Sequence, residues 1–312
     1  MLQVAAPPIN SFELIISQAI MQQSSTKPIT KDRYCIHQVT LMEQCNFRQS
    51  IECLARNDIG KTAVWKHKLA ELDTSEANHI LRDHGVLPHA LCAGVLLGDT
   101  LPDSRPFPLS PEQRLDDLLR LLEQAVAISS PTIVLITGGL AGYGRDLVRA
   151  RNDALETLAA FVPYAKAAKV SLSLEPLHPM VCGNRSVIST LSEANDFLNA
   201  LGLDEHHNDH VGIALDSYAL WWQSDLKDQI SNTAQRIHHF HVSDWLADTR
   251  DIRLDRGMPG DGLIDNRRIR HWLEEAGFNG AIEVEIFSRE NWWKKPPDDV
   301  VQTIVGRYKT AL

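Results

Sequence analysis

From about residue 32 onward, the 312-residue chain repeats one unit: a short apolar or β-branched run, a turn, and an amphipathic stretch. Each run predicts a strand, and the stretch after it predicts a helix packed against that strand. No linker rich in Pro, Gly or Ser divides the repeats into halves. An uninterrupted series of strand–helix units favours one closed (β/α)8 TIM barrel over two domains. Eight such runs occur, at residues 34–41, 62–65, 88–97, 132–137, 170–175, 211–217, 237–243 and 281–287.

The helical stretches carry recognisable start and stop signals. Ser110 and Thr190 each stand three residues before a Gln or Glu, the spacing of a capping box that satisfies the free amides of a first helical turn. Gly85, Gly202 and Gly277 each follow an apolar helical stripe, as glycines that end helices do. These signals support helices between the predicted strands.

A doubly wound open sheet is the competing α/β architecture. It would place a glycine-rich phosphate-binding turn after the first strand. That turn, residues 42–46, contains no glycine. The runs at 132–137 and 170–174 are apolar nearly throughout, as expected for parallel strands covered on both faces. The sequence therefore predicts a single-domain α/β barrel over residues 33–312. Residues 1–32 are expected to form an N-terminal extension with one short helix near 12–21.

Charge and cysteine content restrict the function classes. The chain has 31 basic and 40 acidic residues, a net charge of −9, which argues against a broad nucleic-acid-binding surface. Its five cysteines show no CxxC spacing, so neither a disulfide framework nor a cysteine zinc site is indicated. A cytoplasmic protein fits this pattern best.

Two stretches could suggest a membrane or secretory segment, and neither has the required pattern. The uncharged stretch 124–144 contains a Ser-Ser-Pro sequence and a Gly-Gly pair that would break a membrane helix. The N-terminus has no Lys or Arg before Lys27, and its apolar run is interrupted by Glu13. We expect no membrane partner.

Ionisable residues end four consecutive predicted strands. The fifth strand ends at Glu175 and the sixth at Asp216, the seventh carries His241 near its end, and the eighth carries Glu285. Active sites of such barrels lie at the carboxyl ends of the strands, so these side chains should converge. Three carboxylates and one imidazole suit a divalent ion such as Mn²⁺, Mg²⁺ or Co²⁺, and Zn²⁺ is also a candidate.

Strand pleating sorts the neighbouring ionisable residues. Side chains alternate between the two faces, so His239 should share a face with His241, and Glu283 with Glu285. His241 and Glu285 lie closer to the strand ends and are the predicted ligands. His239 is expected either in the barrel core or behind a ligand. The other histidines, including His89, are assigned mostly to helices, turns and loops.

Several stretches resemble the sugar phosphate isomerase and epimerase superfamily, whose members have a xylose isomerase-like TIM barrel. The resemblance covers essentially residues 33–312. By this resemblance, Glu175, Asp216, His241 and Glu285 match the metal ligands. One position departs from the pattern: many members carry a His three residues after the aspartate of strand six, where this chain has Ala219. The matching stretches are 175–180, 215–222, 240–245, 255–265 and 283–288.

The resemblance implies a metal-dependent isomerase or epimerase, with Mn²⁺ as the preferred cofactor. A divalent ion that chelates a carbonyl and its neighbouring hydroxyl acidifies the intervening C–H and stabilises an enediolate intermediate. Glu175 and Glu285 would move the proton. The sequence contains no sugar-phosphate cradle, so a keto-sugar, polyol or sugar acid is the expected substrate.

Further residues are predicted to bind the substrate. Arg256, in a glycine-rich turn after strand seven, would hold a hydroxyl or a carboxylate. Trp221 would form an apolar wall for a sugar face. His178, Asn184 and Arg185 lie on the loop after strand five and would line the pocket.

Three alternatives remain open. The same residues would serve a dehydratase of the inosose dehydratase type, in which water leaves in place of reprotonation. A non-catalytic metal- or ligand-binding barrel draws support from Ala219. An endonuclease like another branch of the superfamily would need more strand-end histidines and a basic groove. Barrels of this type often pair through their loop faces, so a homo-oligomer is also among the expectations.

Overall fold

The structure is a computed structural model that describes residues 27–98, 108–202 and 210–312. The helix predicted near residues 12–21 lies outside these ranges. So does most of the predicted 1–32 extension.

The strands close into a parallel barrel in the order β1-β10-β7-β6-β5-β4-β3-β2. Each strand pairs with its neighbours in parallel, and the last barrel strand, β10, pairs with the first, β1. The predicted TIM barrel is confirmed. Its strands are β1 (Tyr34–His37), β2 (Lys61–Trp65), β3 (Leu87–Val95), β4 (Thr132–Ile136), β5 (Ser171–Leu174), β6 (Val211–Asp216), β7 (Ile237–Val242) and β10 (Ile282–Val284).

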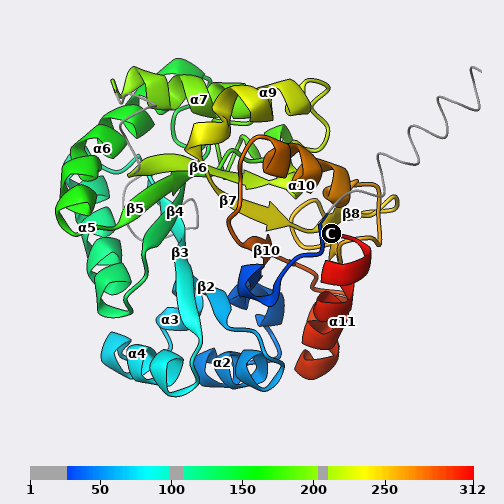
Figure 1. The fold of residues 1–312 in the computed structure, drawn as a ribbon. Helices are drawn as coiled ribbons and strands as arrows, with labels where there is room; N and C mark the ends of the chain where they lie inside the picture. The colour runs from blue at the N-terminus through cyan, green and yellow to red at the C-terminus, as the bar shows by residue number, and fades with distance from the viewer. Residues whose placement is uncertain (1–26, 99–107, 203–209) are drawn as a thin grey trace, which may run out of the picture.

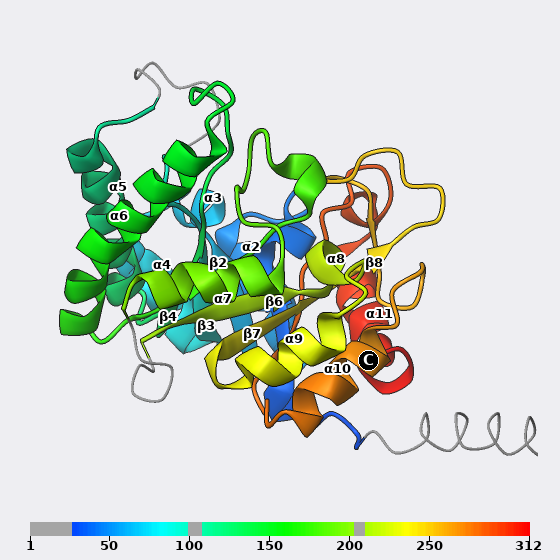
Figure 2. The same ribbon diagram turned by 90° about the horizontal axis from the view of Figure 1, so that it is seen from above.

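Helices surround the strands (Figure 1). Figures 1 and 2 place α5 and α6 beside β3–β5, and α10 and α11 on the opposite side of the barrel. The longer helices are α2 (Phe47–Arg56), α4 (Thr74–Asp83), α5 (Pro111–Ala127), α6 (Leu147–Ala167), α7 (Leu191–Ala200), α9 (Leu226–Thr233), α10 (Asn266–Glu275) and α11 (Pro297–Thr310). The single-turn helices are α3 (Lys66–Leu69), α8 (Ser217–Leu220) and the 3-10 turns η1 (Lys31–Arg33), η2 (Gln38–Leu41), η3 (Pro179–Val181), η4 (Ala234–Arg236) and η5 (Trp292–Lys294).

The predicted helix signals form as expected. Ser110 and Gln113 make a reciprocal capping box at the start of α5. At α7 the Thr190 side chain accepts a hydrogen bond from the Glu193 amide. Gly85 and Gly277, which follow α4 and α10, have φ angles of +64° and +99°, a conformation that glycine adopts without steric cost. In the described ranges, no helix is long and apolar enough to cross a membrane.

Two predicted strands, 34–41 and 281–287, are each four residues shorter in the structure. β1 ends at His37, because the chain turns into η2 there, and β10 ends at Val284. The residues after these strands form the barrel mouth. A small antiparallel hairpin, β8 (Asp244–Trp245) and β9 (Arg256–Gly257), follows β7 and carries the glycine-rich turn.

Tyr308 on α11 holds the seam where the barrel closes. Its buried hydroxyl lies 2.7 Å from the carbonyl oxygen of Cys35 and 2.8 Å from that of Ile282, so its proton can be donated to either, and it accepts a hydrogen bond from the Cys35 amide at 3.1 Å. The ring stacks on Tyr34, with centroids 3.9 Å apart. One side chain thus ties the first barrel strand to the last.

We expect Tyr308→Phe to destabilise the protein by about 1–3 kcal/mol, because buried backbone groups at the seam would lose their partner. Urea unfolding followed by circular dichroism measures this change. Tyr164→Phe is the matched control, since Tyr164 is exposed. Equal unfolding midpoints for the two variants would contradict the proposed role of Tyr308.

Candidate active site

The four predicted ligands lie together at the carboxyl end of the barrel. Asp216 is the last residue of β6 and His241 belongs to β7. Glu175 and Glu285 directly follow β5 and β10, and their amides donate to carbonyls of neighbouring strands. All four side chains are buried. The strands therefore bring residues 110 positions apart in the sequence, from 175 to 285, into one cluster.

Three carboxylates of this cluster converge, and a guanidinium lies between two of them. One oxygen from each of Glu175, Asp216 and Glu285 lies within 4.8 Å of the others. Arg256 Nη1 donates to Asp216 Oδ2 at 2.9 Å and to Glu285 Oε2 at 3.0 Å. The guanidinium thus partly offsets the negative charge that the strand ends concentrate.

Arg256 is itself held in place by its surroundings. It belongs to β9, and its amide donates to the Phe287 carbonyl at 2.8 Å. Its guanidinium lies over the rings of Tyr218 and Phe287, 4.4 and 4.9 Å from their centroids, a cation–π arrangement. Arg256, which was predicted to bind substrate, is buried beside the carboxylates.

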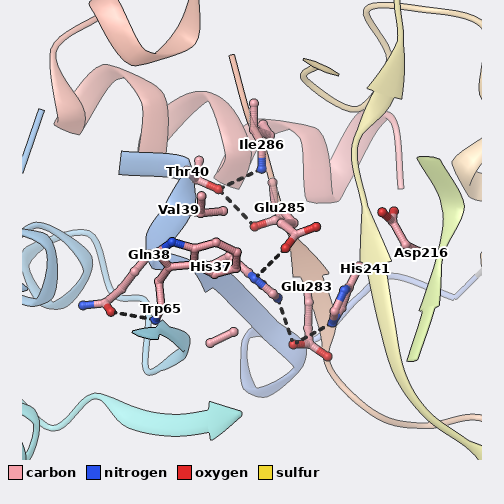
Figure 3. A network of polar contacts seen from close by, with 12 residues as sticks. His37, Gln38, Val39, Thr40, Trp65, Asp216, His241, Glu283, Glu285 and Ile286 are labelled. Atoms are coloured by element: carbon pink, nitrogen blue, oxygen red, sulfur yellow. Dashed lines mark hydrogen bonds and ion pairs between the residues drawn. The ribbon is translucent and has the colours of Figure 1, made fainter. Parts of the chain in front are cut away.

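His241 and His37 supply the nitrogen atoms of the cluster. His241 Nδ1 lies 2.9 Å from Glu175 Oε1, and His37 Nδ1 lies 3.2 Å from Glu285 Oε1. The two rings meet edge to face with centroids 4.6 Å apart. Figure 3 shows His37 reaching toward the carboxylates of both Glu283 and Glu285. Each proposed catalytic carboxylate is thus oriented by its own histidine.

The electrostatics follow from this crowding. Burial raises the pKa of Asp216 to about 6, because Glu285 and Glu175 add to the effect and Arg256 only partly opposes it. Burial alone would lower the pKa of His241, but the carboxylates of Glu283 and Glu175 outweigh it and raise the value to about 10. Burial would raise the pKa of Glu285, whereas His37 and Arg256 together hold it well below its usual range. The cluster has an excess of carboxylates and would be stabilised by a further cation.

The donor set fits a divalent cation. Carboxylate oxygens and an imidazole nitrogen are the ligands that Mn²⁺, Mg²⁺, Co²⁺ and Zn²⁺ take in proteins. One nitrogen of His241 lies 2.9 Å from Glu175 Oε1, and a nitrogen of the same ring lies within 4.8 Å of a Glu285 oxygen. Glu175, Asp216, Glu285 and His241 could therefore hold one ion, with Arg256 displaced from at least one carboxylate oxygen.

The pocket above these carboxylates is small, and a larger cavity adjoins it. A pocket of about 70 Å³, called the mouth pocket below, reaches Glu175, Glu285 and Arg256. A cavity of about 520 Å³ beside it shares Trp65, Arg185, Arg253 and Phe287 with that pocket but contacts none of the three carboxylates. The reacting atoms of a substrate must therefore enter the smaller pocket.

A family model described as xylose isomerase-like TIM barrel matches residues 50–305. This match covers most of the chain. The chain belongs to the xylose isomerase-like TIM barrel family. The resemblance to this family, which was inferred from five sequence stretches, is thereby confirmed.

Three relatives illustrate the range of similarity. A crystal structure of a protein from Sinorhizobium meliloti 1021 is 37% identical, with a TM-score of 0.82 over 90% of this chain and 99% of that one. An inosose isomerase from Bacillus velezensis is 22% identical over 87% of this chain and 94% of the relative. A structure of the IolI protein with a bound zinc atom is 19% identical, with a TM-score of 0.73 over 88% of this chain and 95% of that one.

Some of the predicted substrate-binding residues line the mouth pocket, and others do not. His178 and Arg185 line the mouth pocket. The ring of His178 lies 5.0 Å from that of Trp245, and burial lowers its pKa. Trp221 packs partly buried against the core and Trp245, and does not line the pocket. The backbone of Asn184 lies against Gly139, where a Cβ would come within 2.4 Å, and Asn184 also lies outside the pocket lining.

Ala219 occupies the position where many members of this family carry a histidine. It is buried on α8 and lines the mouth pocket. Its carbonyl accepts a hydrogen bond from Trp222 Nε1 at 2.7 Å. The methyl side chain supplies no ligand, so the imidazole nitrogens beside the carboxylates come from His37 and His241.

Sequence reasoning missed two histidines of the barrel interior. His37 was not singled out, because the predicted strand 34–41 continued past it, whereas β1 ends at His37 in the structure. His89 was not assigned to the site, yet it lies within β3 and faces Glu283, with Nε2 3.5 Å from Oε1. The prediction that His239 shares a face with His241 is consistent with the contacts of both to Glu283.

Proposed function

We propose that this protein is a divalent-metal-dependent isomerase or epimerase that acts on a keto-sugar, polyol or sugar acid. A cyclic polyhydroxy ketone such as inosose is the first candidate, because relatives that align over most of the chain are named inosose isomerase. The observation that carries the proposal is the convergence of Glu175, Asp216 and Glu285 within 4.8 Å of one another, two of which, Glu175 and Glu285, line the mouth pocket.

The barrel order sets the catalytic geometry. β5 and β10 are separated by β6 and β7, so the carboxylates that follow them approach the pocket from well-separated sides. A substrate above the cluster would meet Glu175 on the side of β5 and Glu285 on the side of β10. This arrangement suits removal of a proton at one residue and its return at the other.

Glu175 is the proposed proton acceptor. Among the described side chains, the Glu175 carboxylate forms an ion-pair contact with one basic residue, His241. The Glu285 carboxylate forms such contacts with two, His37 and Arg256. Glu175 would take the proton from the carbon next to the substrate carbonyl, and the C–H electron pair would remain on the substrate as an enediolate. Return of a proton to the opposite face of the same carbon gives the epimer. Return to the former carbonyl carbon, while the proton of the neighbouring hydroxyl moves to the former carbonyl oxygen, gives the isomer.

The metal would be held by Glu175, Asp216, His241 and Glu285, with Mn²⁺ as the first candidate and Mg²⁺, Co²⁺ and Zn²⁺ as alternatives. When bound, it would supply Lewis acidity toward the carbonyl and hydroxyl oxygens of the substrate. Arg256 would then bind a substrate oxygen from its position over Tyr218 and Phe287. His178 and Arg185 would contact the remainder of the substrate.

A panel of inososes, ketoses, polyols and sugar acids tests the proposal, assayed by NMR with each of the four metals. We expect interconversion of isomers with at least one substrate and one metal. A product that absorbs in the ultraviolet would instead identify a dehydratase, which would use the same groups to expel water. Metal binding with no turnover of any compound would favour a non-catalytic barrel.

A further inference from the structure

A buried carboxylate lies one layer below the proposed catalytic cluster, surrounded by imidazoles. Glu283 precedes Glu285 by two residues and is fully buried. His239 Nδ1 lies 2.7 Å from its Oε1, and His89 Nε2 lies 3.5 Å from the same oxygen. Its other oxygen faces His37 Nε2 at 3.4 Å and His241 Nε2 at 3.7 Å. Figure 3 shows Glu283 below Glu285 on the same strand.

Four polar atoms around this carboxylate are buried without a hydrogen-bond partner in the described part of the chain. They are Glu283 Oε2 and the Nε2 atoms of His89, His37 and His241. Buried polar atoms in folded proteins are nearly always satisfied, so such orphans point to a missing partner. The donor atoms of His89, His239 and Glu283 all lie within 4.8 Å of one another. An ion between them would satisfy His89 Nε2 directly.

An irregularity in the barrel directs His89 into this layer. In the pairing of β2 with β3, Thr62 faces Pro88 and Ala63 faces Ala90, so His89 is an extra residue. A bulge of this kind locally redirects a side chain, and bulges occur often beside functional sites. The regular alternation of β3 is broken at the residue that completes the cluster.

We propose that His89, His239 and Glu283 bind a second divalent metal ion, with Zn²⁺ as the best match, inside the barrel below the catalytic cluster. Two imidazoles and one carboxylate are a common ligand set for first-row divalent ions, and zinc accepts it with water in the fourth position. The side chain of His89 is 22% exposed, whereas those of His239 and Glu283 are 2% and 0% exposed. The ion would therefore enter from the side of His89.

Zinc stoichiometry tests this site independently of catalysis. Chelator-treated protein is reloaded with Zn²⁺, desalted and analysed by mass spectrometry for metal content. We expect wild-type protein to retain one equivalent more than His89→Gln. Asp216→Asn alters the cluster of Glu175, Asp216 and Glu285 and leaves the proposed ligands of the second ion unchanged. This variant should therefore keep the second ion even if the catalytic cluster binds no metal. His79→Gln, on the exposed surface of α4, controls for adventitious binding to surface histidines.

Equal zinc content in wild-type and His89→Gln protein overturns the proposal. Because a change in the barrel interior can impair folding, a second measurement uses the unaltered protein. Anomalous diffraction at the zinc edge should give a peak about 2.1 Å from His89 Nε2 and from His239 Nδ1. Crystals of zinc-loaded protein that show no anomalous peak between these two nitrogens also overturn it.

Discussion

Glu285→Gln is expected to lower kcat by about 10⁴-fold or more, because one substitution removes a proton-transfer group and a charged metal ligand. The amide would also leave His37 Nδ1 and Arg256 Nη1 without the carboxylate they now contact, at 3.2 and 3.0 Å. The size of the side chain is unchanged, so the fold should persist. Steady-state kinetics on the best substrate of the panel, with circular dichroism as a folding check, measures the effect.

The control for this prediction is Glu290→Gln. Glu290 follows the same strand by a few residues, is exposed, and pairs with Lys294 on the surface. Its substitution should leave kcat within about twofold of wild type, since surface changes away from a site have small effects. Retention of full activity by the Glu285→Gln protein would refute the assignment of Glu285.

Removal of the bound metal is the second change with a large expected effect. Protein dialysed against a chelator should lose turnover by several orders of magnitude, because the Lewis acid that stabilises the enediolate charge is gone. Addition of Mn²⁺, Mg²⁺, Co²⁺ or Zn²⁺ in separate samples should restore activity to different extents and so identify the metal. The melting temperature should rise on readdition, because an ion that binds only the folded state stabilises it.

A variant of the cluster formed by Glu175, Asp216 and Glu285 tests whether the activating metal binds there. Asp216→Asn should prevent reactivation by any metal, since this aspartate is fully buried among the proposed ligands. Undiminished turnover by protein whose metal content has been reduced to trace levels would show that the reaction needs no ion.

The barrel and the clustering of four strand-end side chains could be predicted because they depend on local signals. Apolar runs mark the strands, and parallel strands of a barrel bring their carboxyl ends together whatever the loops do. Glu175, Asp216, His241 and Glu285 follow from this rule alone. His37 did not follow from the rule, because the first strand was predicted to run to residue 41, whereas in the structure it ends at His37.

The remaining features depend on details that a pattern does not encode. His89 enters the interior through a bulge, and a one-residue shift in register leaves no clear mark in the sequence. Trp221 and Asn184 lie on loops near the mouth, and whether a loop side chain faces the pocket depends on tertiary packing. Arg256 was a candidate from its motif, but its position between two carboxylates requires the β8–β9 hairpin.

Solvent isotope exchange tests the central claim most directly, since proton transfer through protein carboxylates is the core of the proposed mechanism. The metal-loaded enzyme is incubated in D₂O with an inosose or the best substrate of the panel, and the recovered isomers are examined by NMR. The account predicts deuterium at the carbon next to the carbonyl in wild-type samples, and none above background with Glu285→Gln protein. Complete conversion of substrate to product without solvent deuterium would contradict it, because the hydrogen would then have moved within the substrate.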